Sequence, residues 1–283
     1  MVAAEQFSAP VAGLGEGAFW DDRTNRFMMV DLLRGDILTL DDSGQPTRAH
    51  VDTIASVIRS RAAGGFVVGV ERGARFLTDD LQPLGDVLTA FDTEGIRMND
   101  GGCDPQGRLY VGSMAYAESA GAGTLYRVDR DHTIVPVLDS VTVSNGIQWS
   151  ADGARVFYND TATGRIAVFD FDDSDGSFHD QRDFVVLPEG VGAPDGMAID
   201  SEDGLWVALW GGSAVRHYDA DGKLSEVIEL PVSKVTCPTF GGPDKATLYV
   251  TTADIDVTNE PLAGAVFRAD VGVTGAPVHA FAG

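Results

Sequence analysis

A repeated unit is the feature of this sequence that most constrains its fold. Six short apolar strands recur along the chain, each bounded by Gly or Asp-Gly, and they begin at Phe27, Phe66, Leu109, Val156, Leu205 and Leu248. The intervals between these starts are 39, 43, 47, 49 and 43 residues. Repeats of roughly 40–50 residues that contain several short strands are typical of the blades of a β-propeller.

Further strands surround each central strand. A segment usually opened by Gly follows it, as in residues 35–40 and 123–128, and a fourth stretch often comes next, as in residues 133–139. No helical periodicity of useful length appears. We therefore predict an all-β fold, a six-bladed β-propeller with four-stranded antiparallel blades, formed by residues 1–283 as a single domain. A long β-sandwich or β-helix is the alternative, but it does not explain the regular spacing. We expect residues 5–11 to add a strand to the last blade and close the ring.

Composition excludes several classes of function. The chain has 20 basic and 43 acidic residues, a net charge of −23, which argues against binding to nucleic acid or to an anionic membrane. The sequence has no apolar run of about 18 residues and no signal-peptide pattern at its start. The two cysteines lie far apart in sequence and predict no disulfide framework. We expect a cytoplasmic protein with no obligatory protein partner.

One position in each unit lies ten or eleven residues before the central strand. These inner positions are Glu16, Ser56, Asn99, Asn145, Asp195 and Cys237. Equivalent positions in a ring of repeats converge on its axis, and four of the six carry an oxygen ligand. An Asp-Gly or Asn-Gly pair taken alone predicts a turn. The shared register instead predicts a common site, just before the innermost segment of each blade.

The residue types at this site indicate a divalent cation. Two carboxylates, Glu16 and Asp195, would neutralise its charge, and the amide oxygens would complete an all-oxygen shell. Such a shell favours calcium, magnesium or manganese over tetrahedral zinc. None of the five histidines holds an inner position, which argues against a Ser-His-Asp triad there. Cys237 is expected to pack, and Arg97 to bind substrate or to pair with Glu94 or Asp100.

Six segments together resemble the senescence marker protein (regucalcin)–gluconolactonase family. They are LGEGAFW (14–20), RMNDGGCDPQGRLYVGSM (97–114), SNGIQWSADGARVFY (144–158), PDGMAID (194–200), LWVALWGG (205–212) and FGGPDKATLYVTTA (240–253). The resemblance runs from about residue 12 to residue 283. It implies a six-bladed propeller, one divalent metal in the central channel, and hydrolysis of sugar lactones.

The resemblance also implies roles for single residues. Glu16, Asn145 and Asp195 match metal ligands, and Asp195 also matches the catalytic acid/base. Asn99 matches a residue that binds the metal, directly or through water, and the substrate. Arg97 matches a substrate-binding arginine. The chain departs from the pattern at Ala117, where some members carry a substrate-contacting glutamate; the neighbouring Tyr116 and Glu118 are therefore the candidate substrate contacts.

The expected reaction is attack of water on a sugar-lactone carbonyl polarised by the cation, with Asp195 moving the proton. Alternatively, the cation activates the water and Asp195 is mainly a ligand. Calcium is the first expectation, with magnesium, manganese, zinc and iron open. Two other functions compete: hydrolysis of another electrophile, such as an organophosphate or a non-sugar lactone, and calcium binding without catalysis.

Overall fold

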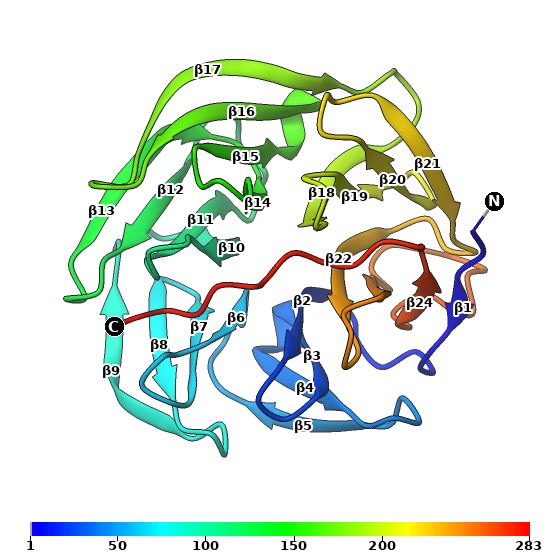
Figure 1. Cartoon of the computed structure of the whole chain (residues 1–283). Coiled ribbons are helices and arrows are strands. Elements are labelled where there is room, and N and C mark those ends of the chain that lie inside the picture. Colours follow the sequence, from blue (N-terminus) through cyan, green and yellow to red (C-terminus); the bar gives the residue numbers. More distant parts are fainter. Residues whose placement is uncertain (1) are drawn as a thin grey trace.

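The computed structural model describes residues 2–283 and confirms the predicted architecture: six four-stranded antiparallel sheets form a ring around a central channel (Figure 1). Helical structure in this part of the chain is limited to the 3₁₀ helices η1 (Leu32–Arg34) and η2 (Thr161–Thr163). No helix of residues 2–283 has both the length and the apolar character needed to cross a membrane.

The first three blades follow one another along the chain, each running from the channel outward. Blade 1 contains β2 (Gly15–Asp21), β3 (Arg26–Asp31), β4 (Asp36–Leu40) and β5 (Pro46–His50). Blade 2 contains β6 (Ile58–Ser60), β7 (Phe66–Val70), β8 (Gly73–Leu77) and β9 (Pro83–Thr89). Blade 3 contains β10 (Ile96–Cys103), β11 (Leu109–Ala115), β12 (Gly123–Val128) and β13 (Ile134–Val141).

The last three blades repeat this order, except that the sixth combines both ends of the chain. Blade 4 contains β14 (Ser144–Trp149), β15 (Arg155–Asp160), β16 (Arg165–Asp172) and β17 (Ser177–Val186). Blade 5 contains β18 (Ala193–Ile199), β19 (Leu205–Trp210), β20 (Ala214–Tyr218) and β21 (Leu224–Glu229). Blade 6 contains β22 (Val235–Gly241), β23 (Thr247–Thr252), β24 (Phe267–Asp270) and β1 (Glu5–Gln6).

The second strand of every blade begins within one residue of the predicted start. A larger difference occurs at β24, which starts at Phe267 although the Gly-led pattern predicts residue 264. Gly264 instead adopts a left-handed φ of 78°, and its carbonyl accepts hydrogen bonds from Val11 and Ala12. Only glycine adopts this conformation readily, so the glycine ends a turn here before the strand begins.

The cores lie between neighbouring blades. Leu14, Phe19 and Val30 of blade 1, for example, pack in one cluster with Ile58 and Val68 of blade 2. Strands β7 and β2 are buried along their whole length because each is sandwiched between adjacent blades, whereas the outer strand β5 is largely exposed. This gradient follows from the ring: strands near the axis are covered on both faces, and strands at the rim meet solvent.

Strand β1 closes the ring as expected, although it is limited to Glu5–Gln6 of the predicted residues 5–11. Glu5 pairs with Arg268 and Gln6 with Phe267, in antiparallel register on the outer edge of β24. The Arg268 guanidinium also donates to the Glu5 carboxylate at 2.6 Å. The pairing covers the edge that blade 6 would otherwise leave open.

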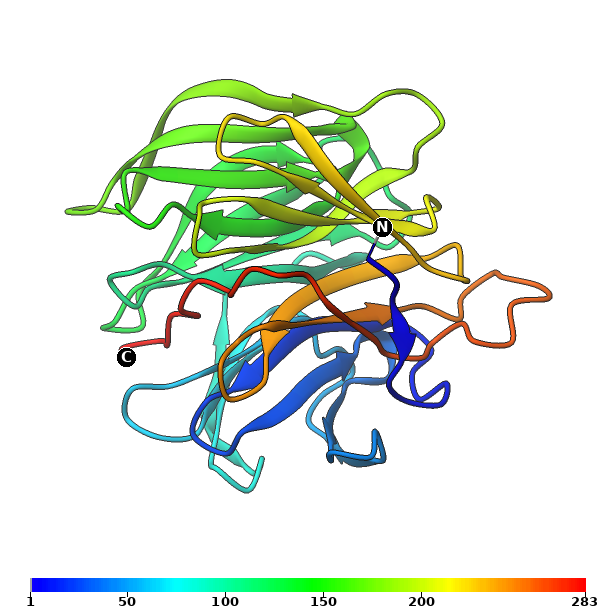
Figure 2. The same ribbon diagram turned by 45° about the vertical axis from the view of Figure 1, so that its right-hand side comes forward.

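Residues 272–283 form a segment that the sequence analysis did not predict, and we call it the C-terminal strap. It crosses one end of the central channel from blade 6 toward the opposite side of the ring (Figures 1 and 2). Its backbone amides reach three blades: Ala276 donates to Ile199, Phe281 to Ser60, and Ala282 to Gly107. The Phe281 side chain is fully buried.

Candidate metal centre and channel

Four of the six inner positions meet in one cavity of about 120 Å³ in the channel, away from the strap. Its polar lining comprises Glu16, Arg97, Asn99, Glu118, Asn145, Thr161 and Asp195, and its apolar lining comprises Leu14, Met114, Val143 and Trp210. Of the other inner positions, Ser56 is buried outside this cavity and Cys237 lines the strap end of the channel. The structure therefore brings together the four inner positions that carry a carboxylate or an amide and leaves Ser56 and Cys237 apart.

Irregularities in the innermost strands bring these side chains to the axis. The pairing register shifts between Glu16 and Phe19 in β2, between Asn145 and Ile147 in β14, and between Met98 and Asp100 around Asn99 in β10. A β-bulge inserts an extra residue and changes the direction of the side chain beside it. Five of the six inner positions thus lie within the innermost strands, which corrects the expectation that they precede them; only Ser56 precedes its strand, β6.

The glycines next to the inner positions allow the innermost strands to approach one another. A Cβ on Gly146 would lie 2.8 Å from the Asp195 carbonyl oxygen, and one on Gly196 would lie 2.8 Å from the Thr236 carbonyl oxygen. Both contacts are with the backbone of the next blade, so a side chain would push the strands apart. The Asn-Gly and Asp-Gly pairs therefore mark close strand packing rather than turns.

The two amide side chains form a continuous hydrogen-bonded row. Arg97 Nη1 donates to Asn99 Oδ1 at 2.6 Å, and Asn99 Nδ2 donates to Asn145 Oδ1 at 3.0 Å. Asn99 Nδ2 also donates to the Ser144 carbonyl at 2.8 Å. In this arrangement Asn145 Oδ1 accepts a hydrogen bond from Asn99, whereas Asn99 Oδ1 accepts one from the Arg97 guanidinium.

Both carboxylates of the centre, Glu16 and Asp195, are buried. Burial raises the pKa of Glu16 well above its usual range, and the nearby Asp195 and Asp100 carboxylates raise it further. Burial and the Asp100 carboxylate likewise raise the pKa of Asp195. Asp195 Oδ1 is buried and has no hydrogen-bond partner among residues 2–283. Two buried carboxylates beside an amide oxygen fit a hard divalent cation, which would supply the missing positive charge.

The donor set is mixed. No cluster of three or more His, Cys, Asp or Glu side chains suited to a metal occurs in residues 2–283. A cation here would depend on Glu16 and Asp195 together with the amide oxygen of Asn145. This composition again favours calcium, magnesium or manganese over zinc.

The remaining predicted residues lie at or near the cavity entrance. Arg97 is buried, and burial lowers its pKa; its guanidinium carbon lies 5.6 Å from the centroid of the Tyr116 ring. Tyr116 is 48% exposed and does not line the cavity itself, and its hydroxyl donates to Glu71 at 3.0 Å. Glu118 lines the cavity from a left-handed backbone conformation, with φ of 51°. The alternative ion pair of Arg97 with Asp100 or Glu94 is not found within residues 2–283.

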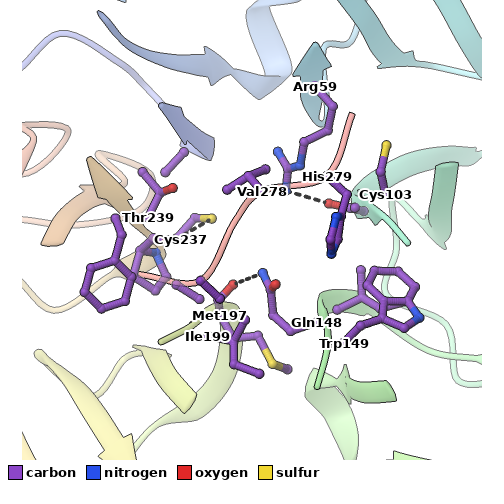
Figure 3. Close-up of a pocket in the computed structure, with 18 of the residues that line it drawn as sticks. Arg59, Cys103, Gln148, Trp149, Met197, Ile199, Cys237, Thr239, Val278 and His279 are labelled. Atoms are coloured by element: carbon purple, nitrogen blue, oxygen red, sulfur yellow. Dashed lines mark hydrogen bonds between the residues drawn. The ribbon is translucent and has the colours of Figure 1, made fainter. Parts of the chain in front are cut away.

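The strap end of the channel contains polar residues that the sequence analysis missed. A second cavity, of about 40 Å³, is lined by Arg59, Asp100, Cys237 and His279 among others (Figure 3). Arg59 donates to the Gly101 carbonyl at 3.0 Å, and burial raises the pKa of Asp100 to about 6. The strap places His279 in the lining of this second cavity. Cys237 is buried, as its expected packing role requires.

Comparisons with known proteins agree with this architecture. A profile of the SMP-30/Gluconolactonase/LRE-like region matches residues 14–254. Regucalcin from Gallus gallus is 35% identical over 288 residues, 95% of each chain, and Pentonolactonase XacC from Haloferax volcanii is 34% identical over 277 residues, 93% of each chain. The solved structure of a calcium-binding regucalcin from Agrobacterium tumefaciens matches with a TM-score of 0.91 at 25% identity, covering 99% of this chain and 98% of that one. The chain belongs to the SMP-30/gluconolactonase/LRE-like family.

Proposed function

We propose that this protein is a divalent-metal-dependent hydrolase that opens sugar lactones to aldonic acids. The observation that carries the proposal is the pair of buried carboxylates, Glu16 and Asp195, beside the Asn145 amide oxygen in an accessible cavity. The names of relatives support it, since one is a pentonolactonase and another a calcium-binding regucalcin. The polar half of the lining suits a substrate rich in hydroxyl groups.

Glu16, Asn145 and Asp195 would hold the cation, with Asn99 close by. We expect calcium first, with magnesium, manganese, zinc and iron to be compared. When bound, the cation supplies a Lewis acid that polarises the lactone carbonyl and stabilises the negative charge formed on its oxygen. The orphaned oxygen of Asp195 is the group most in need of such a partner.

The side chains of the cavity divide the remaining work. Arg97 and Glu118 face the space where substrate hydroxyls would lie, so they would orient the ring, with Asn99 and Tyr116 as further contacts. Asp195 would take a proton from the attacking water as the new C–O bond forms. It would then return that proton to the ring oxygen when the lactone C–O bond breaks, which leaves the carboxylate as it began.

A carboxylate that binds a cation is a weak base near neutral pH. The alternative role for Asp195 is therefore that of a metal ligand that transfers no proton. Asp195→Asn separates the two, because an amide oxygen still coordinates but does not accept a proton in this way. Near-full turnover by that variant with metal bound would assign Asp195 a ligand role alone.

The test uses chelator-stripped protein, with each metal added back, and a panel of sugar lactones, aliphatic lactones and a phosphotriester. Metal binding is measured separately by calorimetry, and Asp195→Ala is the control. We expect sugar-lactone turnover to return with metal and to be absent from the variant. Metal binding without turnover of any lactone would refute the proposal. Turnover of the aliphatic lactones or the phosphotriester alone would assign another electrophile, in keeping with the apolar half of the cavity.

A further inference from the structure

The hydroxyl of Thr161 lies between the innermost strands of two blades. Thr161 is the first residue of η2, directly after β15, and it lines the cavity. Its Oγ1 is 2.7 Å from the Pro194 carbonyl oxygen and 2.7 Å from Asn145 Nδ2. A carbonyl only accepts hydrogen bonds, so the single hydroxyl proton goes to Pro194. Toward Asn145 the hydroxyl is left as an acceptor, and it therefore requires the NH₂ side of that amide to face it.

Arg97 imposes the same direction from the other end of the row. A guanidinium only donates, so the 2.6 Å contact with Arg97 requires Asn99 to present its oxygen there. The NH₂ group of Asn99 then faces the Ser144 carbonyl and Asn145 Oδ1. Turning over either amide would place two donors or two acceptors against each other at both of its ends.

We propose that Thr161 is a positioning residue that keeps the Asn145 amide turned with its oxygen toward the cation. The inference rests on the proposed metal site. An amide turned the other way would present N–H groups to the cation and would no longer act as a ligand. Groups that orient metal ligands from behind typically change metal affinity 10–100-fold when they are removed.

A purely structural role for Thr161 makes a different prediction. Its bond to Pro194 also ties blade 4 to blade 5, next to the bond that Asn159 Nδ2 donates to the Asp195 carbonyl at 2.7 Å. If the tie were all that mattered, loss of the hydroxyl would lower the melting temperature in chelator and leave metal affinity unchanged. If Thr161 positions the Asn145 amide, loss of the hydroxyl lowers the metal affinity itself.

The experiment titrates Ca²⁺ into chelator-stripped protein by calorimetry and records melting curves in chelator. Thr161→Val keeps the shape without the hydroxyl and is expected to raise the Ca²⁺ dissociation constant about 10–100-fold. Thr161→Ser keeps the hydroxyl and should stay within about threefold. Thr163→Val is the matched control, because Thr163 belongs to the same short helix but is exposed and bonds only within the local backbone. Should Thr161→Val fail to fold, Thr161→Cys replaces it, since a thiol is a poor hydrogen-bond partner.

An Asn145→Asp background tests the direction of the amide specifically. A carboxylate has two oxygens and no NH₂ group, so its orientation needs no help from Thr161. We expect Thr161→Val to cost less than about threefold in Ca²⁺ affinity there. A wild-type-like dissociation constant for Thr161→Val, or an equal loss of Ca²⁺ affinity in both backgrounds, would overturn the role of Thr161 but not the metal site. Absence of Ca²⁺, Mg²⁺ and Mn²⁺ binding in the wild type would instead reject the metal site, and the inference with it.

Discussion

The substitution Phe281→Ala tests how firmly the C-terminal strap is attached to the ring. The Phe281 ring is fully buried, and its centroid lies 5.6 Å from that of Phe76 in a stacked arrangement. The strap backbone is held at the same place, since the Phe281 amide donates to Ser60 and its carbonyl accepts from Ala62. These backbone bonds do not involve the side chain, so the alanine variant should keep the strap in place and leave a cavity beneath it.

The expected cost follows from that geometry. Replacing a fully buried Phe by Ala removes its transfer free energy and leaves a cavity, which together typically cost about 3–5 kcal/mol. We expect about 3 kcal/mol, because a strap outside the sheets can relax more around the cavity than a central strand can. For a protein of this size, each kcal/mol lowers the melting temperature by about 2–4 °C, so the shift should be about 6–12 °C.

Urea unfolding followed by tryptophan fluorescence measures the change. Val278→Ala is the control, since Val278 lies in the same strap but is 38% exposed; it should cost less than about 1 kcal/mol. A loss below about 1 kcal/mol for Phe281→Ala would refute the reasoning. Hydrogen exchange of residues 272–283 would then be expected to show a strap that opens independently of the ring.

Three further predictions concern single contacts. Burial alone would raise the pKa of Asp200, but hydrogen bonds, above all the one from His217, hold it below its usual range. The stabilisation that the ionised Asp200 gives is therefore complete above the unfolded pKa of about 3.9 and is lost as pH falls through the folded pKa. Asp200→Asn should lower the free energy of unfolding by about 1–3 kcal/mol at pH 7 and by less at pH 3. Denaturant unfolding at both pH values measures the difference. Gly146→Ala should lower both the melting temperature and the Ca²⁺ affinity, because its Cβ would meet the Asp195 carbonyl oxygen at 2.8 Å; an unchanged affinity would contradict the close packing. Tyr116→Ala at the cavity entrance should raise KM for sugar lactones less than tenfold and leave kcat nearly unchanged. A large fall in kcat would contradict this and would show that Tyr116 stabilises the transition state.

The fold was predictable because the information that specifies it is local and repeated. Each central strand is a short apolar run between turn residues, so its start is visible in the sequence; the repeat then gives the number of blades. The inner positions were found for the same reason, since one register applies to all six units. Even so, the sequence did not show that Asn99 and Asn145 lie at bulges within strands, because a bulge depends on the pairing partner.

The strap was not predictable, because its partners carry no local signal. Residues 272–283 are mostly Gly, Ala, Pro and Val and lack strand periodicity. Their backbone amides donate to Ser60, Gly107 and Ile199, far away in sequence. The second channel cavity was missed with it, since His279 enters only through the strap. Asp100 was assigned to a possible ion pair because its burial depends on the bulge beside it.

The joining of both chain ends in blade 6 has a consequence for the timing of biosynthesis. Glu5 and Arg268, which pair across β1 and β24, are 263 residues apart. At a synthesis rate of about 5–20 residues per second, β1 emerges roughly 13–50 s before its partner strand exists. Blades 1 to 5 each consist of consecutive strands and can assemble in turn, whereas β1 must wait, unpaired, for β24. The ribosome therefore sets a lower limit on how soon the ring can close, however fast the individual blades fold.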